Sequence, residues 1–145
     1  MPLGAFISSD EIMSTLKTNP VLGHITTFGG HPVCCAAGLA ALEYLLDNHL
    51  MEQAEAKGRQ YEECLIQHPA VKSIRRTGLL MAIEYGDDAF CEKVVKRAVE
   101  TGLLTEWFLF WPSAMRIAPP LTITSEEIET SCCILLEAID YAIAH

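Results

Sequence analysis

Two short apolar segments joined by a two-residue turn constrain the fold more than any other feature of this chain. Residues 71–76 and 79–85 have the length and apolar content of strands, and Thr77-Gly78 between them has the composition of a tight turn. A parallel pair would need a crossover of about a dozen residues or more. The short connection therefore predicts an antiparallel hairpin.

A second pair of strands is predicted nearer the C-terminal end. Residues 103–110 and 114–117 are short and apolar, and Trp111-Pro112-Ser113 is expected to turn between them. Amphipathic helices are predicted over residues 50–67, from Asp87-Asp88 to Gly102, and from Thr124 onward. This order of elements predicts an α/β fold of the α+β kind, with a mainly antiparallel sheet covered by helices.

The two longest of these helices differ in their apolar faces. Thr124 and Glu127 have the spacing of a capping box at the start of the last helix. Its apolar face is expected to consist of Ile128, Cys132, Leu135, Leu136, Ile139 and Ile143. The helix over 50–67 is more polar, and its thinner stripe consists of Met51, Ala54, Tyr61 and Leu65. We expect that helix to lie on a surface.

The first fifty residues form a less complete pattern. Residues 3–8 predict a strand, and Ser9-Asp10 predicts a short helix that ends near Lys17. After a long loop, Pro32 suits the first turn of a longer helix. One side of that helix carries the small residues Ala37, Gly38, Ala40 and Ala41. Because a single strand cannot complete a sheet, we expect this part to belong to a larger domain.

The charge and hydropathy of the chain exclude some classes of partner. Its 145 residues carry a formal net charge of -9, and the few basic residues are interspersed with acidic ones. This balance disfavours nucleic acid as a partner. No apolar run reaches the roughly eighteen residues of a membrane span, and the start MPLGAFISSDE lacks the features of a signal peptide. We therefore expect a cytoplasmic protein without a membrane partner.

Six cysteines do not form a recognisable metal or disulfide pattern. They occur as two adjacent pairs and two single residues: Cys34-Cys35, Cys132-Cys133, Cys64 and Cys91. Adjacent cysteines on a helix point to different sides, and no C-x-x-C is present, so we expect free thiols and no metal site. Cys34 lies near a predicted helix N-terminus, where thiol pKa values fall, which leaves a thiol enzyme as one alternative.

Two threonines precede a glycine pair at the mouth of the long helix. Hydroxyls and backbone N–H groups in a flexible turn suit a phosphate, which requires several short donors that converge from one loop. Thr26 and Thr27 before Gly29-Gly30 have this composition. The residues alone favour an ordinary threonine turn that leads into the helix over a phosphate site.

Arg116 is the second candidate for chemistry. It is predicted on a strand just before Pro119-Pro120, and a guanidinium in that position can hold a carboxylate with two parallel hydrogen bonds. A surface arginine that pairs with one of the nineteen acidic residues would look the same in the sequence. The residues alone leave both interpretations open.

Four blocks of sequence together resemble one enzyme family. They are MPLGAFISS, HITTFGGHPVCCAAGLAALEYL, RRTGLLMAIEY and MRIAPPLTITSEEI, and they extend over nearly the whole chain. Their order and intervals resemble the last third of the class III pyridoxal-phosphate aminotransferases, such as the acetylornithine and ornithine aminotransferases. The resemblance implies the C-terminal part of a fold-type I transferase.

The resemblance also implies domain roles and site residues. Residues 1–30 would end the large cofactor-binding domain, residues 31–50 would form a connecting helix, and residues 51–145 would form the small C-terminal domain. Thr27, with Thr26 beside it, matches a pair that reaches across a homodimer to the phosphate of the neighbouring subunit's cofactor. Arg116 matches an arginine that binds a substrate carboxylate, in an enzyme that exchanges an ω-amino donor's nitrogen with a keto acid such as 2-oxoglutarate.

The catalytic lysine of the family has no match in this sequence. The resemblance places that lysine, which holds the cofactor as a Schiff base, just before the MPLGAFISS block. The five lysines of this chain all lie outside that motif: Lys17, Lys57, Lys72, Lys93 and Lys96. We therefore assign no catalytic residue here, and we expect this stretch alone to be inactive and to self-associate through the apolar surface where the large domain would dock.

Several residues depart from the family pattern or fit it less well. The stretch TEWFLFWPSA is more aromatic than the ornithine-type enzymes suggest, and His31 stands where asparagine is common. The amino donor is therefore open. We interpret Trp107, Phe108, Phe110 and Trp111 as strand packing, and His24 and His31 as loop residues. The alternative outside catalysis is an α+β module that binds a small anion or a partner protein.

Overall fold

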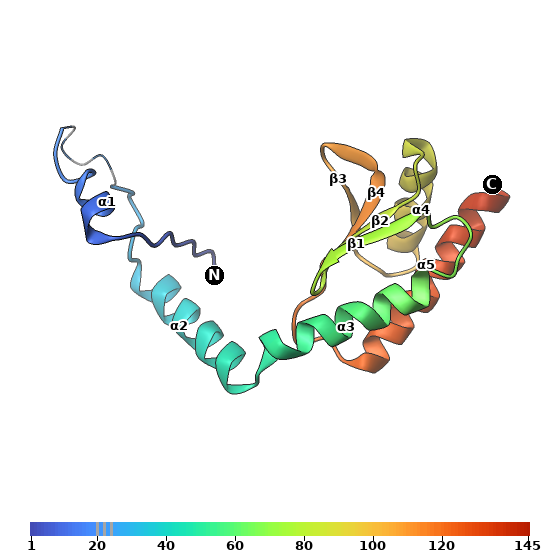
Figure 1. The fold of residues 1–145 in the computed structure, drawn as a ribbon, viewed down its shortest axis with the longest axis horizontal. Coiled ribbons are helices and arrows are strands. Elements are labelled where there is room, and N and C mark those ends of the chain that lie inside the picture. The colour runs from blue at the N-terminus through green and yellow to red at the C-terminus, as the bar shows by residue number, and fades with distance from the viewer. Residues whose placement is uncertain (20, 22, 24) are drawn as a thin grey trace. The chain divides into compact units, whose positions relative to one another are not determined.

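The structure is a computed structural model and describes residues 1–19, 21, 23 and 25–145. The chain divides into two compact units, Met1–Asn48 and His49–His145, and each is described by itself. Figure 1 shows the elements of both units. His24 lies outside the described residues. The division of the chain into a cofactor-domain end, a connecting helix and a small domain stays a prediction.

The second unit is built on a four-stranded sheet in the order β1-β2-β4-β3. All three strand pairings are antiparallel, which confirms the predicted sheet. The strands are β1 (Ser73–Thr77), β2 (Leu80–Glu84), β3 (Glu106–Phe108) and β4 (Trp111–Ile117). The turn between β1 and β2 includes Gly78 at φ +55°, a backbone conformation that glycine adopts without a steric penalty.

The turn between β3 and β4 lies earlier than the sequence predicted. Phe108 pairs with Trp111, so the chain reverses at Leu109-Phe110 and not at Trp111-Pro112-Ser113. Trp107 then pairs with Met115, which leaves an irregularity in β4 that contains Pro112. Proline suggested a turn, but its missing N–H is equally well tolerated in a bulge, where no ladder hydrogen bond is required.

Three helices pack on one face of the sheet and supply most of the core. They are α3 (Leu50–Leu65), α4 (Asp88–Glu100) and α5 (Ser125–Ala144). The predicted caps are present: the Asp87 side chain accepts from the Phe90 N–H at 2.7 Å, and Thr124 and Glu127 form a capping box. Met81, Ile83, Met115 and Ile117 are the buried strand residues that meet these helices.

Two residues expected on the apolar helix faces are exposed. Ile143 is 59% exposed while Ala142 is buried. A helix turns about 100° per residue, so after four turns the buried side of α5 passes through position 142 rather than 143. Met51 is likewise exposed, and the buried residues of α3 are Leu50, Gly58, Tyr61 and Leu65.

Helix α3 approaches the β1–β2 turn closely. A Cβ atom added to the buried Gly58 would overlap the Gly78 carbonyl oxygen. Beside this contact the half-buried Arg76 side chain pairs with Glu55 at 2.9 Å and with Glu62 at 2.6 Å. The hydrogen bonds that the Arg76 guanidinium donates to Glu62 and Glu55 raise the pKa of Arg76. Backbone contact and ion pairs thus both attach the first hairpin to α3.

The first unit has no core of its own among the described residues. It contains α1 (Asp10–Ser14), capped by Ser9, and α2 (Pro32–Asp47), and none of its described residues is buried. Pro32 begins α2 as predicted, whereas α1 ends before Lys17. The strand predicted over residues 3–8 is wrong, because the described part of this unit offers no second strand to complete a ladder.

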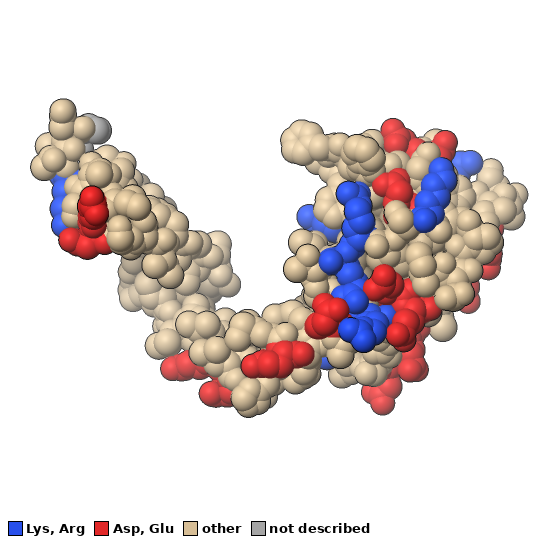
Figure 2. Space-filling model, in the orientation of Figure 1, with Lys and Arg blue, Asp and Glu red and all other residues tan. Residues whose placement is uncertain are grey.

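No helix of the described residues has both the length and the apolar character that a membrane crossing requires. On the face of the second unit seen in Figure 2, basic and acidic side chains alternate, in agreement with the interspersed charges of the sequence.

Replacement of Gly58 tests the contact between α3 and the first hairpin. Gly58→Ala should lower the free energy of unfolding by about 1 to 3 kcal/mol, because the new methyl group has to push the Gly78 carbonyl aside. Urea denaturation measures the change. Gly4→Ala is the control, since no atom lies within 4 Å of its added Cβ. Equal stability of the two variants would contradict the close approach.

Candidate functional site

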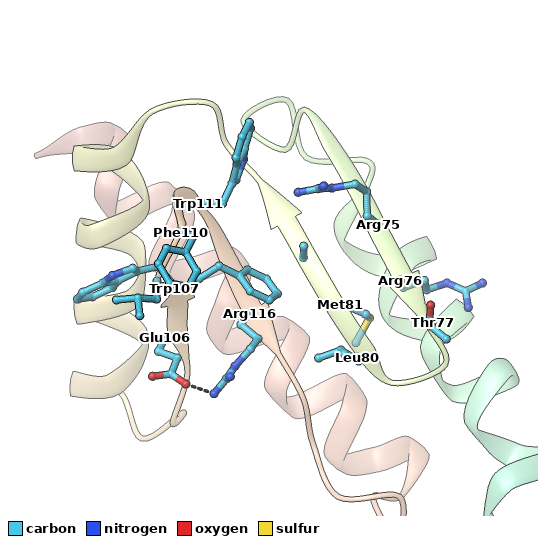
Figure 3. Close-up of a pocket in the computed structure, with 13 residues that line it drawn as sticks. Arg75, Arg76, Thr77, Leu80, Met81, Glu106, Trp107, Phe110, Trp111 and Arg116 are labelled. Carbon is cyan, nitrogen blue, oxygen red and sulfur yellow. Dashed lines mark ion pairs between the residues drawn. The ribbon is translucent and has the colours of Figure 1, made fainter. Parts of the chain in front are cut away.

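The face of the sheet that carries no helix presents charged and aromatic side chains. Register places Arg75 opposite Ala82, Ala82 opposite Arg116, and Arg116 opposite Glu106. Cross-strand partners point to the same side of a sheet, so these four residues form one row across all four strands. Figure 3 shows the hollow of about 740 Å³ above this row.

Arg116 lies in the hollow and forms an ion pair with Glu106. Its Nη2 atom contacts the Glu106 Oε1 atom, the pair marked by a dashed line in Figure 3. The Thr105 hydroxyl donates to the Arg116 carbonyl at 2.6 Å, which ties β3 to β4 beside the pair. The predicted arginine therefore lies on the open face, and its side chain is 44% exposed.

Glu106 is not recognisable as a site residue in the sequence, because Trp111-Pro112-Ser113 has the composition of a turn. Only the observed reversal at Leu109-Phe110, together with the register shift in β4, brings position 106 opposite position 116. An acidic residue in the otherwise apolar stretch TEWFLFWPSA is the one signal that pointed to it.

Glu84 forms the second polar centre on this face. Its carboxylate accepts from the Trp111 Nε1–H at 2.5 Å, the Ser113 hydroxyl at 2.7 Å and the Gly86 N–H at 2.8 Å. Burial of the group opposes ionisation, but these hydrogen bonds and the charge of Arg75 outweigh it and hold the pKa of Glu84 below its ordinary value. Glu84 thus fixes the indole of Trp111 on the open face.

Arg75 lies at the β1 end of the row, beside Glu84. Its nearest carboxylate is Glu84 at 3.9 Å, and its guanidinium carbon lies 6.0 Å from the centre of the Trp111 ring. Within the part of the chain that the structure describes, the Arg75 guanidinium donates no hydrogen bond at shorter range. Arg75 belongs to RRTGLLMAIEY, but nothing in the sequence marks it as a residue of the site.

The aromatic residues of the second hairpin line the hollow instead of the core. Phe110 is 91% exposed, Trp111 57% and Trp107 43%, so their interpretation as strand packing is wrong. Phe110 and Trp111 lie at the turn, and Phe108 is half-buried. Trp107 pairs with Met115 and therefore points to the helix side of the sheet. The uncharged tip of this hairpin stands out from the unit in Figures 1 and 2.

Thr26 and Thr27 lie on an exposed turn of the first unit. The Gly29 N–H donates to the Thr26 carbonyl at 3.3 Å and the His31 N–H to the Phe28 carbonyl at 3.1 Å. A Cβ atom on Gly29 would come within 2.6 Å of the Thr26 hydroxyl, so a larger residue here would displace that side chain. The turn leads into α2 and leaves the Thr27 side chain exposed. Such a turn fits a phosphate oxygen.

His31 stands at the N-terminal end of α2 beside this turn. Its side chain makes no capping hydrogen bond, and its buried Nδ1 atom has no hydrogen-bond partner among the described residues. Its ring lies 6.3 Å from that of Phe28. Nothing in the described residues brings an acid or base to this imidazole.

Two of the cysteines are buried, and two of the lysines have polar partners. Burial raises the pKa of Cys91 to about 12 and also raises that of Cys132, so neither thiol ionises at neutral pH. Among the described residues, no group of three or more potential ligands could hold a metal ion. The Lys57 ammonium group donates to the Leu121 carbonyl at 2.8 Å, and the Lys17 Nζ atom lies 3.7 Å from the Asp10 Oδ1 atom.

Comparison with known proteins identifies related sequences and structures. Residues 1–139 match the family model described as Aminotransferase class-III. The ornithine aminotransferase from Toxoplasma gondii ME49 is 34% identical, with a TM-score of 0.78 over 92% of this chain and 32% of that one. The omega transaminase from Pseudomonas jessenii, solved in complex with PMP, is 27% identical, with a TM-score of 0.79 over 92% and 32%.

A Bacillus anthracis aminotransferase is 31% identical, with a TM-score of 0.78 over 91% of this chain and 34% of that one. The chain therefore spans about a third of the length of the structures that it matches.

The low pKa of Glu84 predicts a pH-dependent contribution to stability. A carboxyl whose folded pKa lies below its ordinary value of 4.5 stabilises the fold above that value, and the contribution is lost as pH falls through the folded pKa. Glu84→Gln should therefore lower the free energy of unfolding by about 1 to 2 kcal/mol at neutral pH and by less in acid. Urea denaturation at both pH values measures this difference, and a cost that does not shrink in acid would contradict it.

Proposed function

Because the chain belongs to the class III aminotransferases, which use pyridoxal phosphate, we propose that it supplies two binding elements of such an enzyme. Arg116 binds a substrate carboxylate, and Thr27, with Thr26 beside it, contacts the cofactor phosphate. The enzyme transfers an amino group from an ω-amino donor, of the acetylornithine or ornithine type, to a keto acid such as 2-oxoglutarate. The observation that carries this proposal is the position of Arg116 in the hollow.

Arg116 has the geometry and the exposure that a carboxylate site requires. A guanidinium offers two parallel N–H donors that match the two oxygens of a carboxylate. Glu106 forms an ion pair with this guanidinium on the open face. A substrate carboxylate that binds Arg116 takes the place of the Glu106 carboxylate. The positive charge is then never left without a partner, and the exchange keeps the energetic cost of binding low.

The Thr26–Thr27 turn fits the phosphate of the cofactor. Its donor is the exposed Thr27 hydroxyl, on a turn in which position 29 is glycine. Phosphate binding by a loop requires this close approach of the backbone. We propose that the contact is made across a homodimer, to the cofactor of the neighbouring subunit.

The proposed domain roles follow from membership of the same family. Residues 1–30 end the large cofactor domain, 31–50 form the connecting helix, and 51–145 form the small domain. When bound, pyridoxal phosphate supplies the electron sink on which amino-group exchange depends. The lysine that binds it lies in the part of the family that precedes the MPLGAFISS block. We place the enzyme in the cytoplasm on the sequence argument alone.

Substitution of Arg116 tests the carboxylate site. In an enzyme that joins this chain to a cofactor-binding lysine domain, Arg116→Ala should lower kcat/KM for 2-oxoglutarate by about 10- to 100-fold, because charge-assisted hydrogen bonds to the carboxylate are lost. Arg116→Lys should restore part of the loss, since it keeps the charge but not the paired donors. Steady-state kinetics with varied keto acid measures both effects.

The matched control is Arg59→Ala, which removes an exposed arginine on α3 whose guanidinium lies 3.7 Å from the Glu55 carboxylate. It should leave kcat/KM unchanged. Normal kinetics of Arg116→Ala would exclude the carboxylate role, and absence of transamination in the unsubstituted enzyme would favour an α+β binding module instead.

Substitution of Thr27 tests the phosphate contact. Thr27→Val keeps the shape of the side chain and removes its hydroxyl, so the cofactor should bind about 10-fold more weakly in the same enzyme. Equilibrium dialysis of pyridoxal phosphate measures this affinity. Thr18→Val, which removes another exposed threonine hydroxyl of the first unit, is the control. Unchanged affinity in Thr27→Val would contradict the assignment.

A further inference from the structure

A second cavity, of about 470 Å³, lies on the helix side of the sheet, opposite to the face that carries Arg116. Its walls come from α3, α5 and the loops that precede β3 and follow β4 (Figure 1). We propose that this cavity binds a small primary ammonium compound with an apolar body. The inference goes beyond the proposed function, because it uses neither the Arg116 side chain nor the Thr26–Thr27 turn.

The hydroxyl groups that line the cavity have already donated their protons. The Ser131 hydroxyl donates to the Ile128 carbonyl at 2.8 Å, so the Tyr61 hydroxyl is the donor in its 2.7 Å hydrogen bond with Ser131. The Thr105 hydroxyl donates to the Arg116 carbonyl at 2.6 Å. A hydroxyl oxygen whose proton is engaged can still accept a hydrogen bond. The side chains of the lining therefore offer acceptors and favour a ligand that donates.

Glu127 adds a negative charge to these acceptors. Its Oε2 atom accepts from the Thr124 N–H at 2.8 Å in the capping box, while its Oε1 atom accepts no hydrogen bond from the described residues. Burial raises the pKa of the Tyr61 hydroxyl, and the charge of the nearby Glu127 carboxylate adds to the rise. Among the described residues of the lining, Glu127 alone carries a charge. A cationic donor is therefore favoured over an anion.

The N-terminal end of α5 does not cancel this preference. A helix N-terminus is equivalent to about half a positive charge, whereas the first turn of α5 carries the two carboxylates of Glu126 and Glu127. Glu127 is also exposed. An ammonium group beside it keeps part of its hydration, so the energetic cost of desolvation stays small.

The two loops provide a place for the apolar body of the ligand. Leu103 and Leu104 precede β3, and Pro119 and Pro120 follow β4. Leu104 is 93% exposed, so its surface is available to a ligand, and burial of apolar surface is favourable in proportion to its area. The volume of the cavity lies in the range of small-molecule sites, about 300 to 1,000 Å³.

Amide chemical shifts of the 145-residue chain test the proposal. The probe is hexylammonium, and hexan-1-ol, hexanoate and methylammonium are the comparisons. Hexylammonium should shift the amide signals of Ile123 and Ser131 to saturation and leave that of Arg75, on the open face, unchanged. Its half-saturating concentration should be about 5-fold lower than that of hexan-1-ol. Hexanoate and methylammonium should bind more weakly still, because the first has the wrong charge and the second lacks the apolar body.

Glu127→Gln is the deciding variant. Glutamine at this position still forms a capping box, so the start of α5 is kept while the charge is removed. Hexylammonium should then bind about as weakly as hexan-1-ol. The matched control is Glu126→Gln, which removes the neighbouring acid of the same turn outside the lining. This variant should keep the full preference for hexylammonium.

Three results would each overturn the proposal. The first is that hexanoate binds as tightly as hexylammonium, or that Glu127→Gln keeps the preference for hexylammonium. The second is that hexylammonium shifts the signal of Arg75 and not those of Ile123 and Ser131. The third is that binding is lost when the chain is joined to a cofactor-binding lysine domain, since another part of the enzyme would then cover the cavity. None of these results changes the kinetics expected for Arg116→Ala, so the two proposals fail separately.

Discussion

The antiparallel sheet of the second unit packs helices on one face only, and the rest of the structure depends on that asymmetry. Along β4, Met115 and Ile117 enter the core while Arg116 between them points to the open side. The two-residue period of a strand thus makes the same segment carry packing and chemistry on opposite faces. A helix on the second face would have buried the arginine with its charge.

The contacts that make the open face rigid lie beside the row of Arg75, Ala82, Arg116 and Glu106, and not within that row. Glu84 receives three hydrogen bonds that hold Trp111, Ser113 and Gly86 in place. Arg76 is held by Glu55 and Glu62 on α3, and Gly58 lets that helix approach the first turn. The Arg116–Glu106 pair is the more exposed contact, so it is the one that a ligand can exchange without loss of packing.

Local signals predicted the elements of the second unit well. The hairpin around Thr77-Gly78, the Asp87 cap and the Thr124–Glu127 capping box are all present, because turns and caps depend on residues only a few positions apart. Two predictions failed for a non-local reason. Residues 3–8 have no strand partner in the described part of the chain, and the second hairpin reverses at Leu109-Phe110 because a bulge accommodates Pro112.

The sequence by itself determined the family and the antiparallel sheet, since these follow from short motifs and their order. The site roles of Thr26, Thr27 and Arg116, which the resemblance supplies, stay predictions. Only the tertiary structure decided that Arg116 meets Glu106, that Arg75 shares its row, and that the aromatic residues line a hollow and not the core. The reason is register: the alignment of β3 on β4 depends on where the chain reverses and bulges, and a shift of one residue would turn every side chain to the other face.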